Sequence, residues 1–408
     1  MKKLFTLMVL LTISITLFGN FDFFPGNPAN NANRNYSKIY IPFSAYNINI
    51  NNSILRLEDL MMFEKGHELT DNEKEILTSN DLILDFNTNL YILNFGHQNW
   101  NFEFSVKTYG DVEILDQMYS NLVIYGNDTD RPYISHTGIR SKVFSFWRGT
   151  LNYAYPKGVY LGMIPGLFPE EKASSFVEYL RDMTLFIGVN INLDYSMNYA
   201  VIDESLQEFG SMVDSLHYYY KAQFKYTDEH SVGRLSPSFG LGLKAKIFNG
   251  NFHAQIDDVF MQLNYRNLAG GWHERYYRND LLFFDEDYEA IDETFAEDDS
   301  TRVQSRSVKF NPSLSLGFDY AITNDFEVMA KYINNNHSHK NGPSIGAGYQ
   351  WRWLPIQAVI GYDKNVFYDF RTGLIFNNFE LQTGITFYHG FFRYGKGFGL
   401  NSAMSIKF

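Results

Sequence analysis

The sequence predicts an all-β protein, a transmembrane antiparallel β-barrel of the bacterial cell outer membrane. Three observations predict this class: a segment typical of export at the start, many aromatic residues without long apolar runs, and an apolar–polar alternation that continues to Phe408. Barrel strands alternate lipid-facing apolar residues with lumen-facing polar residues, so they produce no long apolar run. We expect about 14–16 strands, a range set by boundary errors of a few residues per element.

The start of the chain resembles a secretory signal peptide. Lys2 and Lys3 precede an apolar run from Leu4 to Phe18, and Gly19 offers a small residue near which cleavage could fall. These are the charged, apolar and small-residue regions of an export signal. A retained membrane anchor is the alternative.

The chain divides into three segments. We expect a signal peptide over residues 1–20, an N-terminal plug or cap segment over 21–80 that belongs to the barrel domain, and the transmembrane β-barrel over 81–408.

Composition excludes several classes of site and partner. The 408 residues include no cysteine, so disulfides, thiolate metal sites, cysteine nucleophiles and lipoprotein anchoring are excluded. Aromatic residues make up 17% and charged residues 20%, against roughly 25% charged residues in typical soluble domains. The net charge of −12 argues against a nucleic-acid partner, because phosphate binding needs clustered Lys and Arg.

The clearest strand pattern lies in the C-terminal third. Apolar residues alternate with polar residues or glycine in the runs 344–353, 355–362, 366–376, 379–388 and 398–408. A period of two places one kind of side chain on each face of a strand. In a membrane barrel the apolar face points to lipid and the polar face lines the lumen.

The last run carries a candidate membrane-insertion signal. Its alternating apolar residues are Phe398, Leu400, Met404, Ile406 and Phe408. An apolar, in-phase terminal aromatic resembles the signal by which outer-membrane barrels are recognised for insertion. Barrel-assembly machinery and outer-membrane lipid are therefore expected partners. The alternative is the buried last strand of a periplasmic sandwich.

Connections between the runs alternate in length. Barrels of this kind have short periplasmic turns and longer outer loops, so the acidic segment 267–303 is expected outside the cell. Tight connections lie at 249–250, 322–325, 354–355 and 377–378, and longer ones at 228–236, 267–303, 334–343 and 389–397.

Short helices are expected to interrupt the wall. Segments 169–183 and 205–216 carry apolar residues at helical spacing. The sequence from Thr70 to Glu73 matches a capping box, which begins a helix.

Few motifs suggest chemistry, so we expect no catalytic residues, no metal and no cofactor. His337 and His339 alternate on a strand but lie in an Asn-rich predicted loop without nearby ligand partners. The stretch from Asp285 to Asp299 contains many acids without the spacing of a calcium loop. It indicates a solvated surface loop, with weak divalent-ion binding as the alternative.

One N-terminal motif carries a family resemblance. Asn27-Pro28-Ala29 resembles the start of the long-chain fatty-acid transporter family of outer-membrane barrels, and of related barrels associated with secretion and conjugal transfer. The resemblance implies that this segment belongs to a plug, or hatch, inside the lumen and that its three residues are hatch or ligand-path candidates. Independently, Pro28 fixes φ and disfavours helix at Asn27, which gives a rigid turn.

The sequence therefore predicts a non-enzymatic outer-membrane channel for passive uptake of a hydrophobic or amphipathic small molecule. The alternative is a barrel accessory to secretion, conjugal transfer or envelope assembly, with an envelope protein as partner; the long segment 267–303 and the expected helices favour it. An outer-membrane lipid hydrolase is the third hypothesis, and no motif supports it.

Overall fold

The computed structural model describes most of the chain from Asn27 to Phe408. The expected signal peptide, residues 169–182 of one expected helix, and His337 and His339 lie outside the described residues. The described residues are 27–32, 36–63, 68–115, 117, 120–121, 124, 133–135, 141–163, 183–211, 215–284, 290–335, 340–351, 354–363, 365–376 and 378–408.

The wall is a closed antiparallel barrel of 14 strands, within the range expected from the sequence. The last strand pairs with the first two short strands, which share one position and close the ring. Closure satisfies backbone groups within the sheet, as lipid requires. In ring order the strands are β1 (Ser37–Tyr40) with β2 (Ala45–Asn52), β3 (Leu82–His97), β4 (Trp100–Leu115), β6 (Ser141–Ala154), β8 (Thr184–Ser211), β11 (Leu235–Ile247), β12 (Gly250–Val259), β15 (Ser313–Ala321), β16 (Phe326–Asn334), β17 (Gly342–Trp351), β18 (Leu354–Asp363), β19 (Asn365–Phe376), β20 (Phe379–Tyr388) and β21 (Gly397–Lys407).

Burial of side chains is inverted relative to a soluble protein. On β8, the side chains of Ile191, Leu193 and Tyr195 are 45%, 52% and 41% exposed, whereas the intervening Asn192 and Asp194 are 1% and 0% exposed. An apolar outer face on a closed antiparallel sheet is suited to lipid, and a polar inner face to a lumen. The chain is therefore an outer-membrane β-barrel.

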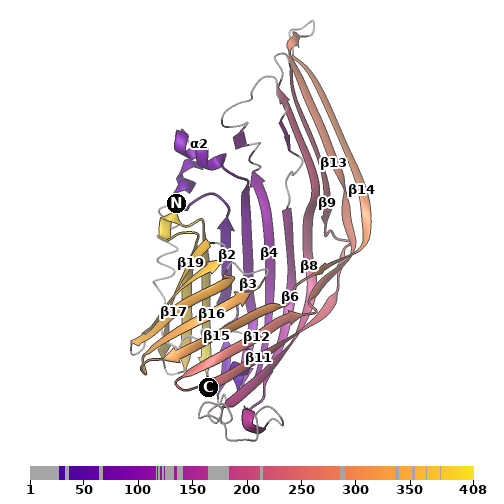
Figure 1. Ribbon diagram of the computed structural model, residues 1–408. Helices are drawn as coiled ribbons and strands as arrows, with labels where there is room; N and C mark the ends of the chain where they lie inside the picture. The colour runs from indigo at the N-terminus through magenta and orange to yellow at the C-terminus, as the bar shows by residue number, and fades with distance from the viewer. Residues whose placement is uncertain are drawn as a thin grey trace, which may run out of the picture.

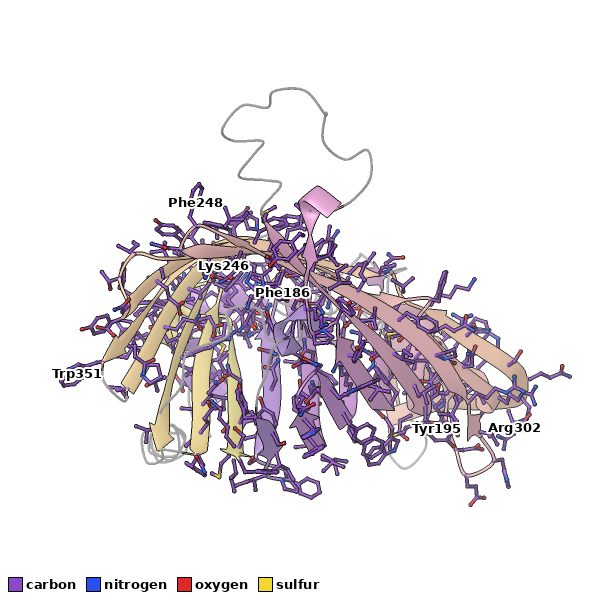
Figure 2. The ribbon with its side chains drawn as sticks, turned by 90° about the horizontal axis from the view of Figure 1, so that it is seen from below. Phe186, Tyr195, Lys246, Phe248, Arg302 and Trp351 are labelled. Atoms are coloured by element: carbon purple, nitrogen blue, oxygen red, sulfur yellow. The ribbon has the colours of Figure 1, made fainter. Side chains whose placement is uncertain are left out.

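The same inversion continues on the opposite side of the ring. On β18, Ile356 and Ile360 are exposed while Gln357 between them is buried. Figure 2 shows Trp351 and Phe248 projecting away from the wall, and both are exposed. The period-two alternation of the sequence thus corresponds to the outer and inner faces of the wall.

One side of the wall rises above the rest. β8 pairs with β11 through its first half and with β9 (Ser215–Tyr226) through its second half. β9 pairs with β13 (Gln262–Phe284), which pairs with β14 (Ala290–Lys309). Two short strands join this side, β5 (Tyr133–Ser135) on β8 and β10 (Val232–Gly233) on β13. Figure 1 shows these strands extending far beyond the short tilted strands β15 to β19.

The strands of the tall side are interrupted at a common level. Short connections separate β9 from β11, β12 from β13, and β14 from β15. Near the end of β12, Asp258 adopts a φ angle of 58°, and Phe260, just beyond β12, adopts one of 64°. Non-glycine residues enter this left-handed region rarely, so the break between the two strands is a sharp, local one.

Tight turns gather at the end of the barrel where Phe408 lies. The Ala321 N–H donates to Asn249 O, and the Lys407 N–H donates to Asn378 O, which links neighbouring turns along this rim. The β13–β14 hairpin rises from the opposite end (Figure 1).

A small cap lies where β2 leaves the wall. It contains the 3₁₀ helix η2 (Asp59–Phe63) and α2 (Asp71–Leu77). The expected capping box is confirmed, because Thr70 and Glu73 exchange hydrogen bonds at the start of α2. Buried residues of the cap are Ile54, Leu55, Met62, Leu77 and Leu82. The remaining short elements are η1 (Pro28–Asn31), β7 (Val159–Tyr160), η3 (Leu161–Met163) and η4 (Phe392–Tyr394).

Within the described residues, no helix is both long and apolar enough to cross a membrane.

Three sequence-based expectations about local structure differ from the fold. The helix expected over 205–216 is wrong, because β8 runs to Ser211 and pairs there with β9. The outer loop expected over 267–303 instead forms most of the β13–β14 hairpin. Residues 37–52, expected within the plug or cap segment, form the wall strand that closes the ring. In each case pairing with another strand decides the local structure, as tertiary context does elsewhere.

Candidate functional site

The Asn-Pro-Ala motif lies at the start of η1, which contacts β6, β8 and β11. The Asn27 side chain caps the turn, since its Oδ1 accepts a hydrogen bond from the Ala29 N–H at 3.0 Å. Its Nδ2 donates to the main-chain oxygen of Leu243 on β11, also at 3.0 Å. Asn27, Pro28 and Ala29 are all buried. The motif thus forms a compact turn fixed to the wall.

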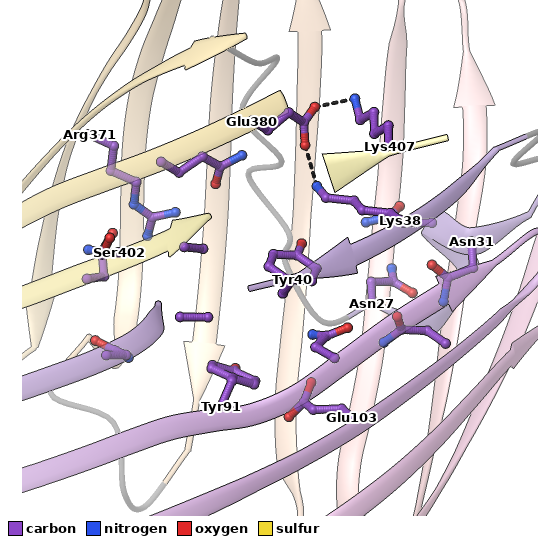
Figure 3. Close-up of a pocket in the computed structure, with 18 of the residues that line it drawn as sticks. Asn27, Asn31, Lys38, Tyr40, Tyr91, Glu103, Arg371, Glu380, Ser402 and Lys407 are labelled. Atoms are coloured by element: carbon purple, nitrogen blue, oxygen red, sulfur yellow. Dashed lines mark hydrogen bonds and ion pairs between the residues drawn. The ribbon is translucent and has the colours of Figure 1, made fainter. Parts of the chain in front are cut away.

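A cavity of about 850 Å³ occupies the lumen beside this segment. Its lining comes from η1 and from most of the wall strands, and nearly all of the lining residues are polar or charged (Figure 3). The lining residues that carry charge are Lys38, Glu103, Lys244, Asp319, Glu327, Lys340, Arg371, Glu380 and Lys407, with His253 beside them.

Glu380 is the centre of one ion-pair group in this cavity. Its carboxylate contacts Lys38 of β1 and Lys407 of β21, one lysine on each oxygen (Figure 3). The Ser405 hydroxyl donates to the same carboxylate at 3.4 Å. The carboxylate is more buried than either lysine side chain. The group therefore joins the first strand position to the last two strands, with two cations around one acid.

Asp369 is the centre of a second group of the same kind. Its Oδ2 lies 2.8 Å from Arg371 Nη2 and 3.0 Å from Lys340 Nζ. Its Oδ1 accepts a hydrogen bond from the Thr386 hydroxyl at 3.0 Å. The acid is buried behind Lys340 and Arg371, which both line the cavity. Each group thus places two cationic side chains around one acid.

Arg148 anchors a buried polar network on the tall side of the wall. Its guanidinium makes a bidentate contact with Asp194, with distances of 2.6 and 3.0 Å. A third nitrogen lies 2.6 Å from Asp258, at the break between β12 and β13. The Ser238 hydroxyl donates to Asp194 at 3.1 Å. The network thus ties β6, β8 and β11 to the sharp break in the neighbouring strand.

An apolar cluster lies on the lumenal face directly beyond Arg148. Phe144 and Phe146 share the inward parity of Arg148 on β6, and both are buried. Tyr199 and Val201 of β8 also face inward, because a register shift opposite Phe144 and Phe146 changes the parity of β8. Such shifts re-aim side chains. The full buried cluster comprises Phe144, Phe146, Tyr199, Val201, Met261, Leu263, Tyr265, Leu268 and Phe310.

The sequence-predicted site residues fall in two places. Asn27, Pro28 and Ala29 lie together against the wall, and Asn27 lines the cavity. The candidate insertion-signal residues Phe398, Leu400, Met404 and Ile406 lie on β21, with Phe408 just beyond it. Ile406 and Phe408 are exposed, while Ser405, directly before Ile406, is buried. Hatch and insertion roles stay predictions.

Sequence reasoning missed the ion-pair groups and the apolar cluster. Their members are far apart in the chain, and only strand register brings them together. Among the described residues no group of three or more His, Asp or Glu could hold a metal ion. Part of the acidic stretch, residues 285–289, lies outside the described residues.

Comparisons with known proteins give similarities in structure. No family model matches the sequence, and no curated protein matches it. The toluene transporter TodX of Pseudomonas putida is 11% identical with a TM-score of 0.46, covering 94% of this chain and 93% of its own. The toluene transporter TbuX of Ralstonia pickettii is 10% identical with a TM-score of 0.40, covering 97% and 96%. A Pseudomonas aeruginosa FadL homologue is 11% identical with a TM-score of 0.33, covering 94% and 92%.

Proposed function

We propose that this barrel is a channel for the passive uptake of a hydrophobic or amphipathic small molecule. The observation that carries the proposal is the apolar cluster on the lumenal faces of β6 and β8. A general diffusion pore has a polar, water-filled interior. The aromatic and aliphatic side chains of this buried cluster, once separated from one another, would offer an apolar molecule an environment that such a pore lacks.

The polar cavity and η1 complete the proposed route. A lumen of about 14 strands exceeds what lining side chains alone can fill, and η1 occupies part of it. Irregular backbone is tolerated at membrane depth where it is buried in protein or lines a water-filled cavity. We propose that Asn27, Pro28 and Ala29 form a hatch, whose displacement would connect the cavity with the region of the apolar cluster.

Deletion of residues 21–36 tests the hatch and the channel together. The deletion ends before Ser37, where wall pairing begins, so the barrel should fold and show heat-modifiable migration. We expect higher ion conductance in planar bilayers and faster entry of an uncharged apolar dye into proteoliposomes.

The rate of entry of a polar molecule is the control for the rate of entry of the apolar dye. The intact barrel should admit the apolar dye faster than an uncharged sugar of similar size, and empty vesicles supply the baseline. Unchanged conductance in a folded deletion variant would contradict the hatch. Dye entry at the baseline rate in both forms would contradict the channel.

The accessory role is the second candidate, and the tall side of the wall favours it. The β13–β14 hairpin extends far beyond the opposite rim (Figure 1), which diffusion through the lumen does not require. If neither the intact barrel nor the deletion variant raises dye entry above the baseline, the accessory role is favoured, with the β13–β14 hairpin as its binding surface.

A further inference from the structure

A row of very small residues crosses the lumenal face where η1 lies. Gly188 of β8 is directly opposite Ala154 of β6 on one side and Gly242 of β11 on the other. Asn190 and Lys244, neighbours of the same parity, carry full side chains, whereas Gly240 on β11 is a further glycine. The wall is therefore locally thin along this row, and η1 contacts the same three strands.

The two glycines leave the space that the N-terminal turn fills. A Cβ at Gly188 would overlap main-chain atoms of Pro28 and Ala29, coming within 2.8 Å even of the Pro28 oxygen. A Cβ at Gly242 would overlap the Asn27 side-chain oxygen and lie 2.6 Å from Pro28 Cδ. Backbone and a proline ring cannot rotate away, so the turn itself would have to move.

A hydrogen bond to the wall and burial both hold the fit. The Asn27 amide donates to Leu243 O, next to Gly242 in the chain. Ala29 is only 1% exposed. Gly149 of β6 provides a contrast, since a Cβ there would have no neighbour within 4 Å. Most other glycines of the described wall are also closely packed, but against atoms of the wall itself. Among the glycines with described surroundings, close approach to η1 belongs to Gly188 and Gly242.

We infer that Gly188 and Gly242 form a seat for the N-terminal turn, and that one added methyl group at either position displaces the turn. They are positioning residues, which act on the lumen through Asn27, Pro28 and Ala29. The inference concerns how the turn is held, and it stands whatever molecule the barrel carries.

Thiol accessibility at Ala29 measures occupancy of the seat. The chain contains no cysteine, so Ala29→Cys introduces a single thiol at a buried position. Gly188→Ala, Gly242→Ala and the matched control Gly149→Ala are each combined with it in the full chain. Overpacking of this kind shifts the seated population by about tenfold or more. We expect a small charged thiol reagent to label the first two variants about tenfold faster than the control.

Folding and conductance are measured on the same three variants without the cysteine. Heat-modifiable migration should be retained in all of them, because a strand residue such as alanine keeps the wall hydrogen bonds. Conductance should rise for Gly188→Ala and Gly242→Ala and stay at the parent level for Gly149→Ala. Equal labelling rates in all three backgrounds would overturn the inference. So would failure of both seat variants to fold while the control folds, because the glycines would then serve the wall itself.

Discussion

Arg148 lies where the lumenal face changes from polar to apolar. Its guanidinium pairs with Asp194 and Asp258 and lies 5.4 Å from the ring centroid of Phe146. A planar guanidinium with several fixed donors suits such a position better than a lysine ammonium does. The residue connects Asp194 of β8 and Asp258 at the strand break to the first aromatic ring of the cluster.

Arg148→Met should destabilise the barrel by about 3–5 kcal/mol, because it leaves the buried Asp194 carboxylate without its cation. The shift in the urea midpoint of heat-modifiable folding measures the loss. Arg148→Lys keeps a charge but loses the bidentate contact, so its midpoint should lie between those of Arg148→Met and the parent.

The double variant Arg148→Met with Asp194→Asn separates charge from packing. Removing both charges should restore much of the midpoint lost in Arg148→Met, since no unpaired ion remains buried. An Arg148→Met midpoint equal to the parent would show that water or another cation already solvates Asp194.

At the scale of elements, the hairpin above the barrel has its own ion pair. Glu274 of β13 lies 2.7 Å from Lys221 Nζ of β9 and accepts a hydrogen bond from the Tyr219 hydroxyl at 2.6 Å. Lys221 is opposite Leu206 of β8, beyond Ile202, the last β8 residue paired to β6. Hydrogen bonds from Lys221 and then Tyr219 hold the pKa of the Glu274 carboxyl below its usual range.

This lowered pKa gives the β9–β13 pairing a pH dependence. A carboxyl whose pKa is lower in the folded than in the unfolded state stabilises the folded state. The stabilisation is complete at a pH above the unfolded-state pKa, and it is lost as the pH falls through the folded-state pKa. At neutral pH, backbone amides of β9 and β13 should therefore exchange hydrogen more slowly in the parent than in Glu274→Gln. In strongly acidic buffer, the two proteins should exchange at equal rates. Glu229→Gln, at an exposed turn residue, is the control. A parent-to-variant difference that persists in acid would assign the effect to something other than ionisation.

The elements also show where sequence patterns mislead. Leu206 and Phe209 lie at helical spacing, yet both belong to β8 and pair with Lys221 and Tyr218 of β9. The acid-rich residues of β14 look like a solvated loop, yet they pair along β13. Local spacing cannot reveal such partners. By contrast, the capping box at Thr70 is a local interaction, and the sequence predicted it correctly.

At the scale of the whole molecule, the inverted sheet predicts an asymmetry between its faces. Leu241 lies near the middle of β11 and is exposed on the outer face. Leu241→Arg should cost about 2–4 kcal/mol for folding into lipid, because it places a charge in hydrocarbon. Gln382→Arg, on a residue that lines the cavity, should cost much less. The free energy of folding into lipid vesicles checks both, and equal costs would contradict the assignment of faces.

Barrel class and a strand range that includes 14 could be predicted from the sequence because the period of two is a local pattern that many of the strands carry. The seat at Gly188 and Gly242 could not, because it depends on the register between β8 and β11. The family resemblance directed attention to Asn27, Pro28 and Ala29, but nothing in the sequence indicates which wall residues receive them.

The position of β1 has a consequence for the order of assembly. β1 pairs with β21, and the Lys38–Glu380–Lys407 group joins strands from opposite ends of the chain. This seam between the first and last strands therefore consists of contacts with very high sequence separation, and such contacts form late in folding. Asn27–Ala32 is tethered only a few residues before β1. Until the seam forms, this turn can enter or leave the open sheet sideways; afterwards the ring encircles it. Formation of the β1–β21 pairing is therefore the step that decides whether the N-terminal turn is enclosed by the barrel or left outside it.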